Sequence, residues 1–137
     1  MRTAIDTNVL SAIFSWESGA EKLAELLTTA SLEGALLISP VVFAELHAYP
    51  GATAAYIRKF LEDTGVMIDQ KLADRVWTEA GLRFARYAAR RRKSTGENPR
   101  RLVADFIVGA HALVQADRLL TLDTKVYRQE FPELRLL

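Results

Sequence analysis

The sequence predicts an α/β fold, a three-layer α/β/α domain in which helices cover both faces of a central parallel sheet. Short apolar runs, typical of buried parallel strands, alternate along the chain with longer segments of helical periodicity. Strands that alternate with helices run parallel and place the helices on the faces of the sheet. The 137 residues, half of them apolar, suffice for one hydrophobic core, so we expect a single domain over residues 1–137.

The first predicted unit is a strand followed by two helices. Residues 2–5 form a short apolar strand that ends at Asp6. Thr7 and Asn8 are cap-type residues, and a helix opens directly after them. An amphipathic helix is then expected over residues 17–32, with apolar residues at helical spacing and charged residues on the opposite face.

The middle of the chain repeats the alternation. An apolar strand over residues 35–38 precedes Ser39 and Pro40, which together favour a helix start because serine caps helices and proline suits the first helical position. We expect a further helix over residues 52–62 and a short strand over residues 66–68.

The last third begins with a long helix over residues 71–92. Its buried stripe is expected at Ala73, Val76, Trp77, Ala80, Phe84 and Ala88. Residues 94–98 form a flexible connection, after which Asn98-Pro99 is expected to restart a helix. The core positions of that helix are Leu102, Phe106, Ala110 and Leu113. Residues 118–122 predict a strand, and residues 134–137 a last strand at an edge.

Four acidic residues stand in apolar or uncharged surroundings. They are Asp6, Glu45, Asp105 and Asp123. Asp6 and Asp123 follow strands, and Glu45 lies on the first helix after a third strand, at the end of a parallel sheet where ligands bind. A carboxylate beside buried surface is costly without a partner, and no matching set of buried bases accompanies these four. The pattern therefore indicates a divalent cation and a metal-dependent hydrolase.

The identity of the metal follows from the donor atoms. Carboxylate oxygens select Mg²⁺ or Mn²⁺, and the chain has no cysteine for a thiolate site. The two histidines, His47 and His111, are two residues after Glu45 and six after Asp105. Neither spacing places the imidazole on the helical face of the acid, so we expect both histidines to be structural or to support ligands indirectly.

Each acid also has a structural interpretation that the sequence leaves open. Asp6 suits a helix cap, and Glu45 gains from the dipole of its helix. Asp105 can pair with Arg101 four residues earlier, and Asp123 suits a turn after its strand. All four interpretations would have to hold together to remove the metal site.

Positive charge is concentrated in one window. Residues 83–101 contain eight bases and one acid and carry +7, so the rest of the chain carries −6. A basic stretch on an acidic body indicates a polyanionic partner such as nucleic acid. The candidate RNA-binding residues are Arg90, Arg91, Arg92, Lys93, Arg100 and Arg101. A solvated helix end that complements the helix dipole is the alternative.

The chain shows no targeting or membrane signal. The start, MRTAID, lacks the pattern of a signal peptide, and no apolar run approaches the roughly 18 residues that span a bilayer. Without cysteine the protein suits a reducing compartment, so we expect a cytoplasmic protein with no membrane partner.

Four segments together resemble a PIN-domain nuclease. They are AIDTNVL, the helix bearing AEL, RRLVADFIVGAHAL, and LLTLDTKVYRQEFPELRLL. More narrowly, they are similar to the VapC toxins of bacterial and archaeal toxin–antitoxin pairs, in order and over essentially the whole chain. The resemblance implies a compact α/β/α domain and a Mg²⁺- or Mn²⁺-dependent ribonuclease site.

The resemblance also assigns residues. The acidic quartet of the family corresponds to Asp6, Glu45, Asp105 and Asp123, all as catalytic residues and metal ligands. Asn8 and Thr121 match polar positions that support the site. Many members carry a further acid two residues after the fourth, where this chain has Lys125. A second metal would be held less well here, and Lys125 is expected to meet substrate phosphate instead.

Partners and products are likewise implied by the resemblance. It implies a homodimer, a cognate antitoxin, an RNA substrate (tRNA, rRNA or mRNA), and products with 5′-phosphate and 3′-hydroxyl ends. The antitoxin would lay a segment into an apolar groove and place a basic side chain among the acids. Residues 17–32 are a candidate wall of that groove by analogy, although a role in the core explains their apolar face equally well.

Two other functions were compared with this one. A catalytically silent RNA-binding module predicts a missing acid, and all four acids are present. An aspartyl phosphatase needs a second aspartate two residues after the first, where this chain has Asn8. A phosphotransfer receiver needs paired acids near the first strand and an acceptor aspartate in mid-chain, and neither is evident.

Overall fold

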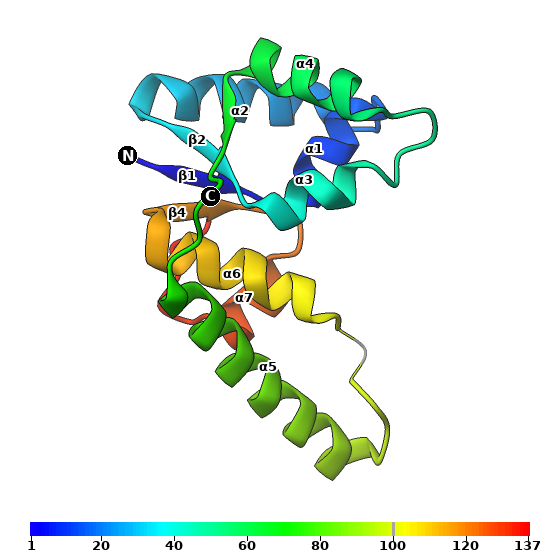
Figure 1. The fold of residues 1–137 in the computed structure, drawn as a ribbon, viewed down its shortest axis with the longest axis vertical. Helices are drawn as coiled ribbons and strands as arrows, with labels where there is room; N and C mark the ends of the chain where they lie inside the picture. The colour runs from blue at the N-terminus through cyan, green and yellow to red at the C-terminus, as the bar shows by residue number, and fades with distance from the viewer. Residues whose placement is uncertain (100) are drawn as a thin grey trace.

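The computed structural model describes residues 1–99 and 101–137, and Figure 1 shows a central sheet between two groups of helices. The elements, in chain order, are β1 (Thr3–Ile5), α1 (Thr7–Phe14), α2 (Ala20–Glu33), β2 (Leu36–Ile38), α3 (Pro40–Leu46), α4 (Ala54–Thr64), β3 (Val66–Ile68), α5 (Asp74–Thr95), α6 (Val103–Gln115), β4 (Arg118–Leu120) and α7 (Thr124–Glu130). The expected alternation of strands and helices is confirmed.

The sheet is parallel throughout, in the order β3-β2-β1-β4. Ala4 of β1 pairs with Leu37 of β2 on one side and with Leu119 of β4 on the other. The carboxyl ends of three neighbouring strands therefore lie side by side. The first residues beyond β1 and β4 are Asp6 and Thr121, which brings two distant parts of the sequence together.

Helices cover both faces of the sheet. In Figure 1, α1, α2 and α4 lie on one side, and α5, α6 and α7 on the other. Helix α3 contacts both α1 and α6, so it closes the gap between the two layers. Helix α5 packs on α6, and its second half projects away from the sheet. Within residues 1–99 and 101–137, no helix combines the length and the apolar character that a bilayer crossing requires.

The core lies between the sheet and its helices. Ile5, Leu36 and Leu120 are buried on the strands. Phe106 and Phe131 are the largest fully buried side chains on the side of the sheet covered by α5, α6 and α7, here called the second layer. Strands β1, β2 and β4 are buried throughout, whereas Met67 of the edge strand β3 is about half exposed. Burial of these strands explains why most of their residues are apolar. The polar exceptions, Thr3 and Arg118, pair with each other, since the Arg118 Nε donates to the Thr3 hydroxyl at 2.8 Å.

Two positions of the predicted α5 stripe are wrong. Ala73 is the exposed residue before the helix, and Trp77 is 50 % exposed. The first turns of α5 border an open hollow of ≈ 510 Å³, which Trp77 lines together with Val41 and Leu72. Helical periodicity correctly places Val76, Ala80 and Ala88 in the core, but it does not show where a helix runs past its neighbours.

Helix α6 begins at Val103 and not at Asn98-Pro99 as expected. Leu102, a predicted core residue, has extended backbone and is 72 % exposed. The Arg101 N–H donates to the Tyr87 hydroxyl (3.0 Å) and so has a partner outside any helix. The described residues before α6 therefore form a connection along α5.

The C-terminal region also differs from the expectation. Strand β4 ends at Leu120, and helix α7, which we did not predict, follows it. The expected strand over residues 134–137 forms only a single parallel bridge between Leu119 and Leu136. Helix α7 has seven residues and no side-chain cap, so it depends on burying Tyr127 and Phe131 rather than on local signals.

Two glycines in the helices of the second layer make a matched test of this packing. A Cβ on Gly109 of α6 would lie 2.4 Å from the buried Phe131 ring, whereas a Cβ on Gly81 of α5 would meet nothing within 4 Å. We expect Gly109→Ala to lower the free energy of unfolding by about 1–3 kcal/mol through overpacking. Gly81→Ala should raise it by up to ~1 kcal/mol through helix propensity. Urea denaturation measures both, and equal effects of the two substitutions would contradict the close contact of α6 with Phe131.

Candidate active site

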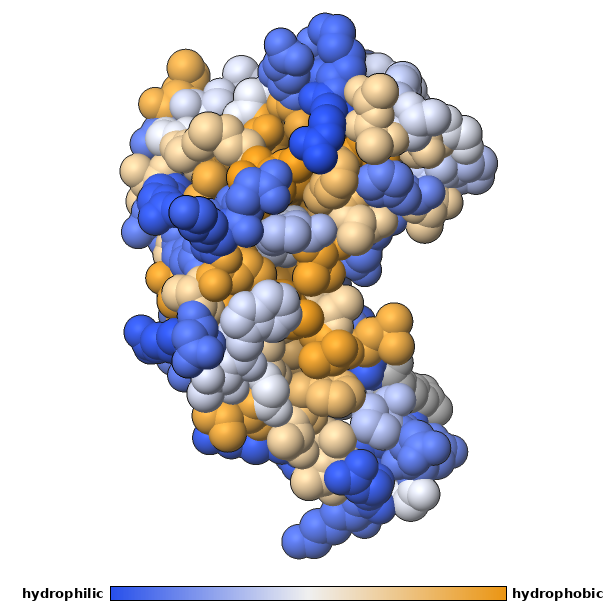
Figure 2. Space-filling view, in the orientation of Figure 1, coloured by the Kyte–Doolittle hydropathy of each residue, from blue (hydrophilic) through white to orange (hydrophobic). Residues whose placement is uncertain are grey.

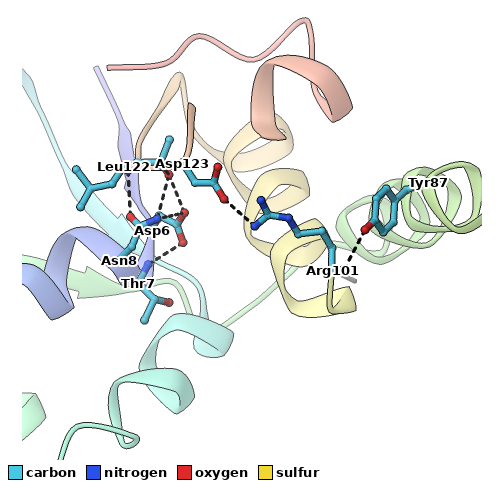
Figure 3. A network of polar contacts seen from close by, with 8 residues as sticks. Asp6, Thr7, Asn8, Tyr87, Arg101, Leu122 and Asp123 are labelled. Carbon is cyan, nitrogen blue, oxygen red and sulfur yellow. Dashed lines mark hydrogen bonds and ion pairs between the residues drawn. The ribbon is translucent and has the colours of Figure 1, made fainter. Parts of the chain in front are cut away.

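Asp6 is held by donors from several parts of the chain. It caps α1 directly after β1 and is only 7 % exposed. Its Oδ1 accepts the Thr7 N–H (2.8 Å), and its Oδ2 accepts the Thr121 hydroxyl (2.8 Å) and the Asn8 amide (3.2 Å), as Figure 3 shows. The carboxylate is therefore fixed in direction before any ligand arrives.

Asn8 and Thr121 join the end of β1 to the segment after β4. The Asn8 Oδ1 accepts the Leu122 N–H (3.1 Å), and the Thr121 Oγ1 accepts the Asp123 N–H (3.0 Å). The Thr121 hydroxyl thus contacts two of the four candidate acids at once. These contacts give both residues a supporting position in the site.

Glu45 lies on α3 and reaches the site through a neighbour of Asp6. Its Oε1 accepts the Thr7 hydroxyl at 2.7 Å, so Thr7 contacts Asp6 with its backbone and Glu45 with its side chain. The expected apolar setting of Glu45 is wrong, because both Glu45 and Ala44 are exposed. The Glu45 carboxylate is therefore open to solvent. Figure 2 shows a notch in the outline of the molecule, on the side where α3 and the beginning of α6 face each other in Figure 1.

Asp105 stands in the first turn of α6, and its half-buried carboxylate accepts no hydrogen bond from the residues the structure describes. Burial raises its pKa, Arg101 opposes that change, and the negative charges of Asp6, Glu45 and Asp123 raise it further. Asp105 therefore lies near enough to each of the other three acids to be affected by its charge. That the four carboxylates converge on one cation stays a prediction.

A fifth group, Tyr127, was not predicted from the sequence. Its hydroxyl lies near the Asp6 carboxylate, and its side chain is 2 % exposed. Burial, followed by the charges of Asp6 and Asp105, raises the pKa of the phenol, so it stays a donor. For Asp6, burial raises the pKa, and the hydrogen bonds from Thr121, Tyr127 and Thr7 oppose that rise. The only sequence signal for Tyr127 was its spacing of four from Asp123, on a helix that was missed.

The four acids are not arranged as a finished metal site. Within residues 1–99 and 101–137, no three carboxylate or imidazole side chains are placed closely enough to hold a metal ion as they stand. One reason is that Asp123 turns toward Arg101 and bonds its guanidinium at 2.7 Å. The donor set nevertheless suits Mg²⁺ or Mn²⁺, because all its ligands are carboxylate oxygens and Asp105 has no donor of its own in the described chain.

The two histidines lie apart from the acids. His111 is 1 % exposed and contacts the Asp69 carboxylate at 3.0 Å, where burial lowers the pKa of the imidazole. The His47 Nδ1 contacts the Phe43 carbonyl at 2.9 Å. Both contacts agree with the structural roles expected for these residues.

Much of the basic window is neutralised within the chain. Arg90 pairs with Glu130, Arg91 with Glu97, and Arg101 with Asp123. Arg92 and Lys93 are exposed near the end of α5, and Lys125 is exposed on α7. Arg100 lies outside the described residues. An open hollow of ≈ 720 Å³ lined by Tyr87, Arg90, Arg91, Lys93, Ser94 and Gln129 extends between α5 and α7.

Burial of Asp105 beside other acids makes a testable prediction about stability. Its pKa in the folded chain is raised above the ordinary 3.8, so its charge opposes folding, and the cost grows as the pH rises through the raised pKa and is complete at neutral pH. Asp105→Asn should therefore raise the melting temperature of metal-free protein at pH 7 by a few degrees. In excess Mn²⁺ the wild type should have the higher melting temperature, because the metal should stabilise only the wild type.

Differential scanning fluorimetry with EDTA or MnCl₂ measures both effects. Asp63→Asn, on the exposed side of α4, is the matched control and should show no response to Mn²⁺ that differs from wild type. A metal-free Asp105→Asn protein that melts below wild type would contradict the expectation that the buried Asp105 charge opposes folding.

Comparison with known proteins identifies the family. The PIN domain family model matches residues 3–132. Two solved structures are similar. VapBC2 from Rickettsia felis, bound to a DNA fragment from its promoter, has 18 % sequence identity and a TM-score of 0.62, and the match covers 100 % of this chain and 98 % of that one. VapBC-1 from nontypeable Haemophilus influenzae has 17 % sequence identity and a TM-score of 0.64, and the match covers 100 % of this chain and 97 % of that one. These likenesses show a shared fold. A search of curated proteins finds no match. The chain belongs to the PIN domain family.

Proposed function

We propose that this protein is a Mg²⁺- or Mn²⁺-dependent endoribonuclease that acts as the toxin of a toxin–antitoxin pair. The observation that carries the proposal is the set of contacts that links the acids: Thr7 bonds Asp6 and Glu45, and Thr121 bonds Asp6 and the backbone of Asp123. The charges of Asp6, Glu45 and Asp123 also act on Asp105, which has no hydrogen-bond donor within the described chain. Membership of the PIN domain family supports a nuclease, because PIN domains are generally nucleases.

The four acids are the proposed ligands and catalytic groups. Asp6, Asp105 and Asp123 would hold the metal, with Glu45 at the accessible side. When bound, such a cation lowers the pKa of a coordinated water and polarises a phosphodiester, which is the usual chemistry of metal-dependent hydrolysis. Because Lys125 stands where many family members have a further acid, we expect one metal ion in the protein without substrate.

The remaining steps fall to groups of the chain itself. Thr121, Asn8 and Tyr127 fix the direction of the Asp6 carboxylate, and Thr7 orients Glu45. A carboxylate of the cluster would accept the proton of the attacking water. The products would carry 5′-phosphate and 3′-hydroxyl ends.

RNA would lie across the acids and along the basic residues. Arg92, Lys93 and Lys125 are exposed cations, while Arg90, Arg91 and Arg101 can meet phosphate only by leaving or sharing their acids. Arg100 belongs to the same proposed set. Contacts of this kind make affinity fall steeply as salt rises. Whether tRNA, rRNA or mRNA is cut depends on RNA shape, which these residues do not specify.

A cognate antitoxin and a homodimer belong to the same proposal, together with action in the cytoplasm. Two similar structures are named as VapBC assemblies, which supports an antitoxin partner. The stripe of α2 over Leu23 and Leu27 is buried in the protein's own core, so it does not form the expected groove wall. Trp16 and Leu32, 75 % and 85 % exposed near the two ends of α2, remain available to a partner.

Cleavage of RNA by purified protein tests the function. We expect Mg²⁺-dependent cleavage that EDTA stops and that falls at least about a thousandfold in Asp6→Asn and in Asp105→Asn. Asp74→Asn, at the exposed start of α5, is the control and should cleave as wild type does. Cleavage that survives both substitutions in the acidic cluster would identify a contaminating nuclease or a wrong site.

The supporting role of Thr121 predicts a smaller effect. Thr121→Val keeps the shape of the side chain and removes both the bond to Asp6 and the acceptor for the Asp123 N–H. We expect a loss of about 10–100-fold in cleavage or metal affinity, as for other groups that orient metal ligands. Titration of cleavage rate against Mn²⁺ measures it, and a wild-type response would remove Thr121 from the site.

A catalytically silent RNA-binding module is the second candidate, favoured by the absence of an assembled ligand triad in the described residues. It predicts RNA binding without cleavage at any Mg²⁺ or Mn²⁺ concentration. The same assay, combined with a gel-shift measurement of RNA binding, distinguishes the two.

A further inference from the structure

Arg101 introduces a positive charge at the edge of the acidic cluster. Its Nη1 bonds the Asp123 Oδ2 at 2.7 Å, across 22 positions of sequence, from the segment before α6 to the segment after β4. The two side chains are 40 % and 32 % exposed, so the pair is partly shielded from water. Figure 3 shows the guanidinium between the segment just before α6, which carries Arg101, and the Asp123 carboxylate. This pair replaces the (i, i+4) pair with Asp105 that the sequence alone allowed.

The backbone of Arg101 is anchored on α5. Its N–H donates to the Tyr87 hydroxyl at 3.0 Å, and the Tyr87 ring packs on Phe106 with centroids 5.5 Å apart. Phe106 is fully buried on α6. The backbone of Arg101 is therefore held in place by helices α5 and α6. This position lets the Arg101 side chain extend to Asp123.

Arg101 and a metal ion would make competing demands on one carboxylate. In the described chain, Arg101 is the only side chain that bonds the Asp123 carboxylate, and it is also the cation that opposes the raised pKa of Asp105. A divalent cation needs the oxygens of Asp123 turned toward Asp6 and Asp105. It would also repel a guanidinium that stayed in place.

We propose that Arg101 is a positioning residue that serves as the counter-ion of Asp123 until a divalent cation binds, and that it then releases Asp123 and faces the substrate phosphate. This inference rests on the proposed function. If the inference holds, Arg101 weakens the binding of the metal and also promotes the cleavage of RNA. A purely structural ion pair would not give these two effects opposite signs.

Isothermal titration calorimetry with Mn²⁺, in the absence of RNA, measures the first effect. Arg101→Gln should bind Mn²⁺ about threefold to tenfold more tightly than wild type, because an ion pair and a nearby positive charge are removed. Arg101→Lys, which keeps the charge, should lie closer to wild type. Arg75→Gln, an exposed arginine of α5 outside the site, carries the same change of net charge and should leave the affinity unaltered.

Cleavage of RNA at saturating Mn²⁺ measures the second effect, and Arg101→Gln should be about 10–100-fold slower than wild type. A side-chain NMR measurement on the unmodified protein keeps the test independent of whether the variant folds. The Arg101 guanidinium should lose its protection from hydrogen exchange when Mg²⁺ is added.

The outcomes separate this inference from the proposed function. Wild-type protein that binds Mn²⁺ through Asp6, together with an Arg101→Gln affinity that is equal or weaker, would overturn the role of Arg101 alone. An Arg101 signal that stays protected at saturating Mg²⁺ would do the same. Wild-type protein that binds no Mn²⁺ would overturn both.

Discussion

Burial of carboxylates at the carboxyl end of the sheet, reinforced by the negative charge of their neighbours, is the constraint on which the rest of the molecule depends. Parallel pairing of β1 with β2 and β4 brings the ends of those strands together, and acids follow two of them directly or closely. Burial and neighbouring negative charge both raise the pKa of Asp6 and of Asp105. Such an arrangement lowers the stability of the fold at the carboxyl end of the sheet, which is characteristic of a functional site.

The surrounding structure limits that cost without removing it. Thr7, Asn8 and Thr121 donate to the Asp6 carboxylate, and the side chains of Asn8 and Thr121 join the segments that follow β1 and β4. Asp123 receives a cation from within the chain, through Arg101. Asp105 receives no hydrogen bond from the described residues, which makes it the acid whose charge a bound cation would relieve most.

The sequence predicted the sheet well, because strand periodicity and parallel pairing are local and topological rules, whereas the sharing of one cation by the four acids stays a prediction. Apolar runs located all four strands to within two residues, and acids at strand ends followed from them. Trp77, Leu102 and helix α7 were missed for another reason. Their placement depends on how far α5 and α6 extend past each other and on the burial of Tyr127, which are properties of the assembled layers. The pairing of Arg101 with Asp123 could not be foreseen, since Asp105 offered the closer partner in sequence.

The central claim is that these acids share one divalent cation. Anomalous diffraction from crystals soaked in MnCl₂ tests it most directly, because the manganese signal locates the ion without assumptions about activity. The account predicts one strong peak within coordination distance of Asp6, Asp105 and Asp123, with the Asp123 side chain turned away from Arg101. A map without a peak at the carboxyl end of the sheet, or with its strongest peak at another acidic cluster, would contradict it.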